Sequence, residues 1–310
     1  MRISVLLPTC NRCDRLPLLF DTIVTTTSVA PGVAEVLVID NGSTDATKQV
    51  VAKYTSLQNP VFRYLESTPG KSRALNLGLR EAKGDILAFI DDDCFPGPGW
   101  VQSILKEFDS DPELSLLGGR VELYDKRDLP QTILLSNDRC VVRTVRQVFV
   151  PTIIGGNMAF RRPVLMATHG YDPMLGPGAV GMACEDLDII YRSLKSGFKI
   201  AYSPEVIIFH NHGRRTKSAE DSTSYAYAFG RGALYAKHIL RFDVHMVPVA
   251  FRELYDLGKT LLKGAMTGTR FPYHRLAFRA TIRGAFSYCQ ARFHWKGFNK
   301  GRLREKTPAY

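Results

Sequence analysis

The chain has 310 residues, of which 45% are hydrophobic and 23% charged. It can therefore bury a substantial core, in one large α/β domain with an appendage or in two modest domains. The longest apolar runs reach about half of the roughly 18 residues that a membrane-spanning helix needs, and Pro8 cuts the first one short. We therefore expect neither a transmembrane segment nor a signal peptide, and a cytoplasmic protein. Six scattered cysteines favour reduced thiols over a disulfide framework.

The net charge of +11 is concentrated near the C-terminus. Residues 1–210 hold 22 Lys and Arg against 24 Asp and Glu, a net charge of −2, whereas residues 211–310 hold 19 against 6, a net charge of +13. This basic segment faces an anionic phospholipid surface, a phosphate-bearing acceptor or nucleic acid, or it is a solubilising surface. Charge alone does not choose among these alternatives.

Short β-rich runs alternate with amphipathic helical patterns through the first half of the chain. Strands are expected at residues 3–7, 35–39, 61–65, 86–90 and 114–117. Helices are expected at residues 16–25, 44–54, 73–81 and 100–108, with Ser43 or Thr44 together with Asp45 as the N-cap of the second helix. This alternation predicts a parallel sheet covered by helices on both faces.

Polar and acidic residues follow three of these strands. Residues 8–11 follow the first strand, residues 40–43 the second, and Asp91, Asp92 and Asp93 the fourth. In parallel sheets the ligand crevice lies beyond the carboxyl ends of the strands. Three adjacent carboxylates at such an end provide oxygen ligands for a hard divalent cation that bridges substrate phosphates. The alternative is an acidic turn that caps the next helix.

The second half of the chain has a less regular pattern. Residues 155–157 (GGN) precede a short apolar stretch, and a Gly/Pro-rich loop covers residues 170–181. A helix is expected at about residues 185–196, followed by a hairpin-like pair of strands at residues 199–203 and 205–209 that ends at His210. From about Ser222 the chain is expected to be helical and basic. Glu185 and Asp186 open the helix at residue 185, where the helix dipole alone favours acidic residues.

Six motifs occur in order between residues 1 and 210: SVLLPTCNR at 4–12, VIDNGSTD at 38–45, GKSRALN at 70–76, FIDDD at 89–93, GGN at 155–157 and EDLD at 185–188. Each is weak alone, but six in order form a strong signal. Together they resemble family 2 of the glycosyltransferases. The resemblance implies a GT-A type α/β fold with a central, mostly parallel sheet flanked by helices. It also implies a catalytic domain at 1–215, with a nucleotide-sugar half at about 1–124 and an acceptor half at about 125–215, followed by a helical basic region at 216–310.

The resemblance also assigns residues to the donor site. It places Asp40 against the nucleotide base, which favours a UDP-sugar, and it surrounds the nucleotide with a further set: Pro8, Thr9, Asn11, Lys71, Arg73, Asp91 and Asp92. Many members carry Arg immediately before the Asn of the GKSRALN motif, whereas this chain has Leu75 there. A cationic contact at that position is therefore in doubt.

For the chemistry, the resemblance implies a divalent cation, Mn²⁺ or Mg²⁺, held by Asp93 with Asp91 and His210. An ordinary histidine at a strand end is the alternative for His210. It further implies Asp186, with Glu185 beside it, as the general base of an inverting transfer. Gly156 and Asn157 are expected on the acceptor side. Arg214 and Arg215 either close over the phosphates or begin the basic segment.

The implied partners are a nucleotide-sugar donor and a hydroxyl acceptor, either saccharide or lipid-linked, in polysaccharide or glycolipid synthesis. In the C-terminal region, apolar residues alternate with cations at residues 251–263, and arginines recur every four residues at 275–283. Such helices either lie on an anionic membrane at the inner face of the cell or pack on the catalytic domain. A nucleic-acid-binding protein and a donor-binding scaffold without turnover are the rival functions, and the acidic strand ends argue against nucleic acid.

Overall fold

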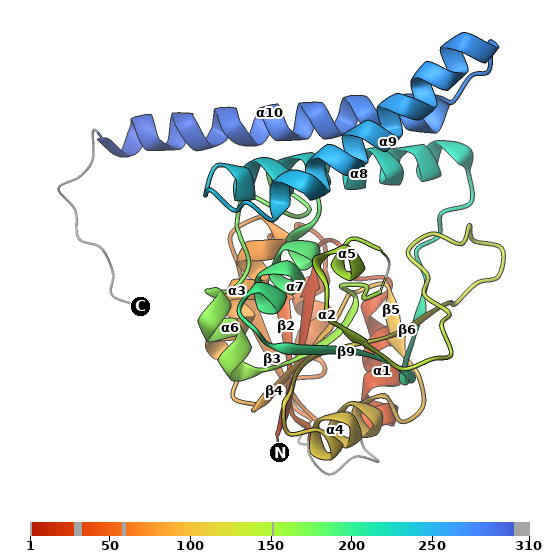
Figure 1. Cartoon of the computed structure of the whole chain (residues 1–310). Coiled ribbons are helices and arrows are strands. Elements are labelled where there is room, and N and C mark those ends of the chain that lie inside the picture. The colour runs from red at the N-terminus through yellow and green to blue at the C-terminus, as the bar shows by residue number, and fades with distance from the viewer. Residues whose placement is uncertain (1, 28–32, 58–59, 151, 301–310) are drawn as a thin grey trace. The chain divides into compact units, whose positions relative to one another are not determined.

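The computed structural model describes residues 2–27, 33–57, 60–150 and 152–300 (Figure 1). The chain forms two compact units, which we call the sheet unit and the helical unit. The sheet unit comprises Met1–Pro173 and Glu185–Glu220, and the helical unit comprises Met174–Cys184 and Asp221–Tyr310. The last ten residues of the region expected to be helical and basic, 301–310, lie outside the described residues.

The described residues of the sheet unit form nine strands, in the order β3-β2-β1-β4-β8-β6-β9-β5, with β7 pairing β9. Their bounds are β1 Ile3–Thr9, β2 Val33–Asp40, β3 Val61–Glu66, β4 Ile86–Ile90, β5 Cys94–Pro96, β6 Leu114–Leu123, β7 Cys140–Val142, β8 Asn157–Arg161 and β9 Lys199–His210. All five strands expected in the first half are present, and each covers the expected residues.

The sheet is mixed. Strands β3, β2, β1 and β4 run parallel, as the alternating pattern predicts, and β6 is parallel to β9. Strand β8 is antiparallel to both β4 and β6, and β5 and β7 are antiparallel to β9. The segment between β6 and β8, residues 124–156, contains β7 and a single-turn helix, and β8 then runs back antiparallel to β6.

Helices cover both faces of the sheet (Figure 1). The bounds in the sheet unit are α1 Leu16–Thr27, α2 Thr47–Ala52, α3 Lys71–Glu81, α4 Trp100–Ser110, α5 Val145–Val148, α6 Arg162–Thr168 and α7 Glu185–Lys195. Buried residues of α1, α2 and α4 share one apolar cluster with alternate residues of β1, β2 and β4. On the other face, Gly78 of α3 lies so close to Leu6 and Ile39 that a methyl group there would overlap their side chains. The expected α/β fold is confirmed.

Two local expectations are wrong. Residues 199–210 form one continuous strand and not a hairpin. The pairing of β9 with β6 jumps from Ser203↔Gly119 to Ile207↔Arg120, so Pro204, which has no N–H to donate, lies in a bulge. The second helix begins at Thr47 and not at residue 44, because the polar groups of Ser43 and Thr44 bond to Asn11 instead of capping a helix.

The helical unit contains α8 Lys217–Ile239, α9 Met246–Thr267 and α10 Pro272–Lys300, with the first turn of α8 still in the sheet unit. Glycines allow close helix contacts: the backbones of Thr281 and Phe229 lie where side chains on Gly232 and Gly284 would extend. The segment Met174–Cys184 also packs here, with Ala183 against Gly230 of α8. Within the described part of the chain, none of the helices combines the length and apolar composition needed to cross a membrane.

Candidate functional site

Three consecutive carboxylates leave the end of β4 in different directions. Asp91 pairs with Lys71, with 2.8 Å between Nζ and Oδ1. Asp92 accepts a hydrogen bond of 2.8 Å from the Thr9 hydroxyl, and Asp93 lies against His210. The next helix, α4, has Gly99 as its N-cap, so the acids do not cap it. Their divergence gives the strand end three separate contact points, and it rules out the acidic-turn alternative.

Burial and the neighbouring charge of Asp93 raise the pKa of Asp92 to about 6. The Thr9 hydrogen bond and the Arg12 guanidinium, whose Nε lies 3.6 Å from Asp92 Oδ1, act in the opposite direction. Burial also raises the pKa of Asp93, but the hydrogen bond from His210 and the charge of Arg214 bring it well below its ordinary value. Of these two neighbouring acids, Asp93 is therefore the one held firmly as an anion.

Asp93 and His210 form a pair that suits a divalent cation. His210 is the last residue of β9, and its Nε2 lies 3.4 Å from Asp93 Oδ1. Its Nδ1 lies 3.0 Å from the Thr132 hydroxyl, which orients the ring. Ligand atoms of Asp93, His210 and Cys94 lie within 4.8 Å of one another. A carboxylate and an imidazole fit Mn²⁺ or Mg²⁺ better than the Cys94 thiol does, because burial raises the pKa of that thiol and hard cations prefer oxygen ligands.

Lys71 joins acids from two distant parts of the chain. Its ammonium lies 2.8 Å from Asp91 at the end of β4 and 3.3 Å from Glu185 at the start of α7. Burial opposes the charge on Lys71, but Asp91, Asp186 and Glu185 raise its pKa well above the ordinary value. Lys71 is therefore a fixed cation at the point where these acids meet.

Asp186 lies against the GGN segment. A Cβ added to Gly155 would lie 1.7 Å from Asp186 Oδ2, so the side chain occupies the space that a glycine leaves open. Gly156 similarly borders Asp91, at 3.1 Å from an added Cβ. Burial and the charge of Glu185 raise the pKa of Asp186 well above its ordinary value, while Lys71 lowers it. Among the described residues, no group donates a hydrogen bond to the Asp186 carboxylate.

The loops after β1 and β2 are bonded to each other. Asn11 accepts a hydrogen bond of 2.8 Å from the Thr44 N–H and donates its own N–H to Ser43 Oγ at 2.9 Å. The buried Asp40 carboxylate accepts bonds of 2.7 Å from the Ser43 N–H and from the Tyr64 hydroxyl. A carboxylate can accept about four bonds, so Asp40 keeps acceptor capacity for a ligand. These contacts hold the two loops together as one wall of the candidate site. Pro8 and Thr9, the last two residues of β1, lie at the start of that wall.

Lys71 is positioned by a tight turn at Gly70, whose φ of 123° suits glycine. The Gly70 N–H donates to Asn41 Oδ1 at 2.6 Å, which ties this turn to the end of β2. Arg73 is exposed, and its guanidinium donates to Pro69 O at 2.7 Å. Of the two expected cations of this segment, Lys71 thus lies among the site acids, whereas Arg73 braces the turn.

The Asn157 side chain does not point toward an acceptor, as we had expected, but into the protein. Its side chain is buried, accepts from Trp100 Nε1 at 2.9 Å, and donates to the carbonyl oxygens of Arg120 and Val206. Both donors and the oxygen are therefore engaged by the protein itself. Asn157 pins the start of β8 and so positions the two glycines before it, which are the part of the motif that reaches the acids.

The segment after β9 contributes a further group that sequence reasoning missed. The His212 side chain is fully enclosed, accepts from the Arg214 N–H at Nδ1, and has no partner for Nε2 among the described residues. Arg215 pairs with Asp125 and Asp128 at 2.6 and 2.8 Å. It is thus held within the sheet unit and is not the start of a free basic segment.

A family model described as "Glycosyl transferase family 2" matches residues 4–167, which is more than half of the chain. The chain belongs to glycosyl transferase family 2. Among relatives of this family, the glycosyltransferase AglE of Haloferax volcanii is 32% identical over 121 residues, or 39% of each chain. A poly-beta-1,6-N-acetyl-D-glucosamine synthase of Staphylococcus aureus is 25% identical over 207 residues, which cover 65% of this chain and 48% of the synthase. The chain thus spans less than half the length of these relatives.

The fold agrees with the family. A mannosyltransferase from Pyrobaculum calidifontis, solved with GDP-Man and Mn²⁺, superposes with a TM-score of 0.61 at 19% identity, covering 94% of this chain and 87% of that one. This likeness confirms the GT-A type fold that the motifs of this family 2 chain predict. The sequence could have indicated His212, because alternate residues of a strand and its extension point the same way as His210. Nothing in the sequence indicated Tyr64 or Thr132.

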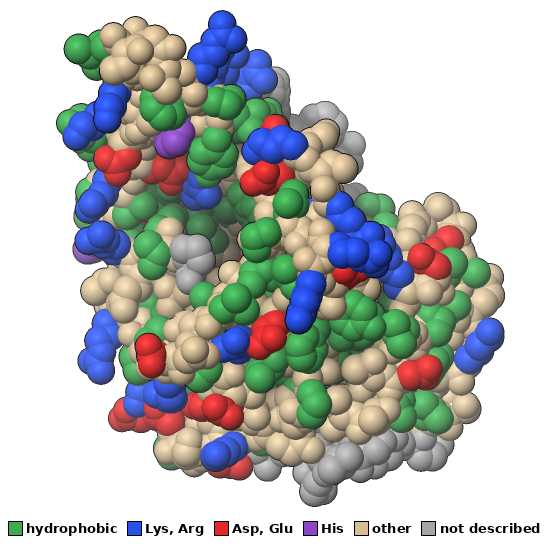
Figure 2. All heavy atoms as spheres, turned by 90° about the vertical axis from the view of Figure 1, so that its right-hand side faces the viewer, with side chains coloured by type: hydrophobic (Ala, Val, Ile, Leu, Met, Phe, Trp, Pro, Cys, Tyr) green, Lys and Arg blue, Asp and Glu red, His purple; other side chains and the backbone are tan. Residues whose placement is uncertain are grey.

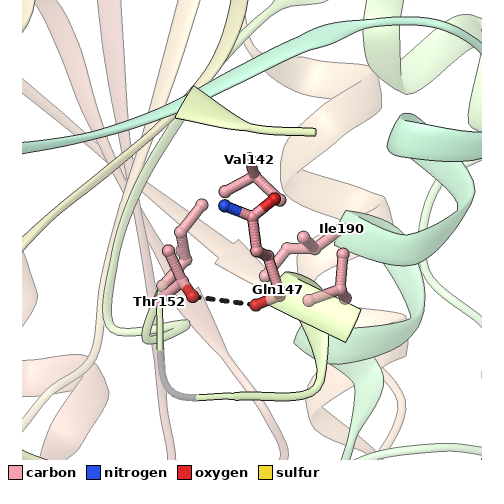
Figure 3. Close-up of a pocket in the computed structure, with 6 residues that line it drawn as sticks. Val142, Gln147, Thr152 and Ile190 are labelled. Atoms are coloured by element: carbon pink, nitrogen blue, oxygen red, sulfur yellow. Dashed lines mark hydrogen bonds between the residues drawn. The ribbon is translucent and has the colours of Figure 1, made fainter. Parts of the chain in front are cut away.

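A separate small pocket in this family 2 chain does not suit a diphosphate. It is a tight depression whose empty space of about 170 Å³ includes open solvent, and it is lined by Val142, Gln147, Val148, Thr152, Ile153 and Ile190 (Figure 3). The Thr152 hydroxyl donates to the Gln147 carbonyl oxygen at 2.8 Å across its floor. None of the six side chains is charged, so the pocket offers nothing to neutralise phosphate. The candidate site remains the acids gathered around Lys71 and His210.

Proposed function

We propose that this chain transfers a sugar from a nucleotide diphosphate donor to an acceptor hydroxyl, with inversion at the anomeric carbon. The observation that carries the proposal is the convergence on Lys71 of acids from β4 and α7, beside the pair formed by Asp93 and His210. One group of side chains can hold a charged donor while a neighbouring carboxylate accepts a proton. A binding protein without turnover needs no such base.

In this proposal the nucleotide lies along the loops after β1 and β2. Asp40 contacts the base, Thr9 and Asn11 form the pocket edge with Pro8, and Asp91 or Asp92 reaches the ribose. Lys71 faces the diphosphate side. Asp93 and His210 would hold a divalent cation, which would neutralise charge on the departing diphosphate. Asp91, the third expected ligand, pairs with Lys71 instead. The Mn²⁺ in the mannosyltransferase complex supports a divalent cation here.

Asp186 is the general base. The acceptor oxygen forms a bond to the anomeric carbon as the bond to the diphosphate oxygen breaks, and the hydroxyl proton moves to Asp186. A raised pKa makes Asp186 a stronger base once it is ionised, and the charge of Lys71 favours the ionised form. A single displacement of this kind inverts the configuration. Glu185 supports this reaction by pairing with Lys71.

The donor and acceptor are proposed by class. Asp40 favours UDP, although the mannosyltransferase that shares the fold was solved with GDP-Man, so fold likeness does not select the base. The N-acetylglucosamine polymer synthase among the relatives supports a saccharide or lipid-linked acceptor in polysaccharide or glycolipid synthesis. The basic helical unit supports attachment to the inner face of a membrane, from the cytoplasm.

The test compares Asp186→Asn with wild type in two assays. Binding of UDP and GDP is measured by thermal shift with and without MnCl₂, and release of nucleoside diphosphate from UDP- and GDP-sugars measures turnover. Asp186→Asn should keep nucleotide binding and lose roughly 10³-fold in turnover, because an amide cannot take the proton. Glu205→Gln, an exposed acid on β9, is the matched control and should behave as wild type. Turnover of Asp186→Asn at the wild-type rate would remove the base assignment.

The metal is tested in the same assays with Asp93→Ala. This variant should bind nucleotide without any further stabilisation by MnCl₂, since it lacks the carboxylate of the proposed pair. An unchanged response to MnCl₂ contradicts the metal assignment. Nucleotide binding without turnover by the wild-type chain, across all donors offered with saccharide and lipid acceptors, identifies a donor-binding protein instead of an enzyme.

A further inference from the structure

Helix α9 presents an exposed apolar stripe. Its members are 50–80% exposed and recur at intervals of four and seven residues: Val247, Phe251, Tyr255, Leu262 and Met266. At 100° per residue these positions fall within a sector of about 100° of the helix circumference. The Phe251 and Tyr255 rings stack with their centroids 6.1 Å apart. The stripe is therefore one sector of the helix and not a scatter of single exposed residues, and it is interrupted at Gly258, where the Phe278 ring would lie 3.9 Å from an added Cβ.

This stripe is distinct from the side of α9 that packs in the helical unit. Met246, Ala250 and Gly264 are buried on the inner side, and Leu257 packs against the apolar cluster that α8 and α10 share. An amphipathic helix normally needs one apolar side for its own fold. Helix α9 has two, and the second is left without a partner among the described residues of its unit.

A row of cations borders the stripe. Arg252, Lys259 and Lys263 are exposed and follow one another at intervals of seven and four residues, on the sector next to the apolar one. The outward carboxylate Asp256 lies 3.8 Å from Arg252. Exposed hydrophobic side chains lie among Lys and Arg side chains on the part of the surface that the C-terminal helices form (Figure 2). Between residues 241 and 293 there are nine Lys and Arg against three Asp and Glu.

We propose that the outward face of α9 docks on an anionic lipid bilayer, with Phe251, Tyr255, Leu262 and Met266 inserted at the level of the headgroups and Arg252, Lys259 and Lys263 against lipid phosphates. This arrangement of an apolar sector flanked by cations is what an interfacial helix requires. A second copy of the chain fits poorly, because the same cations would face each other. The inference sharpens the membrane attachment proposed above, and it can be tested without sugar transfer.

The experiment is co-sedimentation of the full chain with vesicles of phosphatidylcholine alone or mixed with phosphatidylglycerol. Wild type should bind the mixed vesicles, bind phosphatidylcholine alone far more weakly, and be released by NaCl. The triple variant Phe251→Ser, Leu262→Ser and Met266→Ser should bind at least tenfold more weakly. The double variant Lys259→Gln and Lys263→Gln should lose about fivefold for each cation removed.

Met166→Ser is the matched control, because Met166 is a 73% exposed apolar residue of the sheet unit and should not affect vesicle binding. Thermal unfolding checks that each variant folds, and light scattering measures its oligomeric state. Wild type that stays in solution with anionic vesicles overturns the proposal. A triple variant that binds anionic vesicles as well as wild type also overturns the proposal. The same holds if wild type is a dimer that the triple substitution converts to a monomer and no vesicle binding is seen. Nucleoside diphosphate release in solution separates these outcomes from failure of the proposed transfer reaction.

Discussion

The sheet unit gathers carboxylates in a partly enclosed cluster, whereas the helical unit displays cations on exposed helical faces. In the sheet unit, the Lys71 ammonium lies between Asp91 and Glu185, and His210 lies against Asp93. In the helical unit, Arg252 and Lys263 are exposed to solvent. Charges held at close range specify one geometry, while an exposed row of charges recognises a surface of opposite sign without fixing its details.

The two units also use apolar side chains differently. In the sheet unit, the central strands β1 and β4 have no exposed residue. The helical unit leaves large apolar side chains such as Phe251 and Met266 in solvent. A soluble monomer rarely exposes a contiguous apolar surface without a binding partner. The comparison therefore separates a unit built to position a small charged ligand from one built to meet an extended surface.

The largest expected effect comes from Gly155→Ala, in the sheet unit. The new methyl group would overlap the Asp186 carboxylate, which must move away from its position. If Asp186 is the base, turnover should fall by roughly 10³-fold, equal to about 4 kcal/mol in the barrier. Steady-state release of nucleoside diphosphate measures this loss, and nucleotide binding should be retained.

A double mutant sharpens the assignment. Adding Gly155→Ala to Asp186→Asn should cost little more than Asp186→Asn alone, because both changes remove the same group. Losses that multiply in the double mutant would mean that Gly155 serves the reaction by a different route, for example by leaving room for the acceptor. The proposed close packing of the GGN segment on the base would then be incorrect.

The surroundings of Gly155 also show which features of the site could be predicted from the sequence and which could not. The resemblance to family 2 predicted Lys71 and Asp186 as site residues, and the position of Asp91 and Asp93 after a strand predicted that they lie at the ligand edge of the sheet. They could not show that Asn157 turns inward to Trp100, since a side-chain direction depends on partners far away in the sequence. Short irregular elements such as β5 and β7 were missed because three residues carry no periodic pattern.

The hairpin expected at residues 199–210 was wrong for a related reason. Ser203 and Pro204 resemble a turn locally, but pairing with β6 on both sides of them keeps the strand extended. In the helical unit, the sequence correctly predicted that the segment is helical and that its net charge is positive. It could not tell which apolar face of α9 is buried, because that depends on how α8 and α10 pack against it.

A smaller effect is expected from Glu253→Gln, in the helical unit. Glu253 of α9 pairs with Arg231 at 2.8 Å and accepts the Tyr235 hydroxyl, and both partners come from α8. These side chains are largely enclosed, with 22% of Glu253 and 27% of Arg231 exposed, so removing the negative charge leaves a cation without compensation. The unit should lose about 2 kcal/mol of stability, measured by urea unfolding or by hydrogen exchange in α8 and α9.

Asp256→Asn provides the control for Glu253, because it removes an acid from the same helix that is exposed and lies 3.8 Å from Arg252. Its effect on unfolding should be within about 0.5 kcal/mol. Equal losses for the two variants would show that net charge, and not the enclosed contact between α8 and α9, holds the helical unit together. Glu253→Gln should leave nucleotide binding unchanged, since its partners are all in the helical unit.

The smallest expected effect is a gain in stability from Gly258→Ala. Gly258 lies inside α9, and an added Cβ would meet the Phe278 ring at 3.9 Å, an ordinary contact. Alanine loses less backbone freedom than glycine in a helix, so the unit should gain about 0.5–1 kcal/mol in urea unfolding. The same change at Gly155 removes the space that the Asp186 side chain occupies. The two Gly→Ala variants should therefore have opposite effects, because the site requires Gly155 whereas helix α9 does not require Gly258. A loss of stability at Gly258 would show that α9 and α10 pack more tightly there than the 3.9 Å distance indicates.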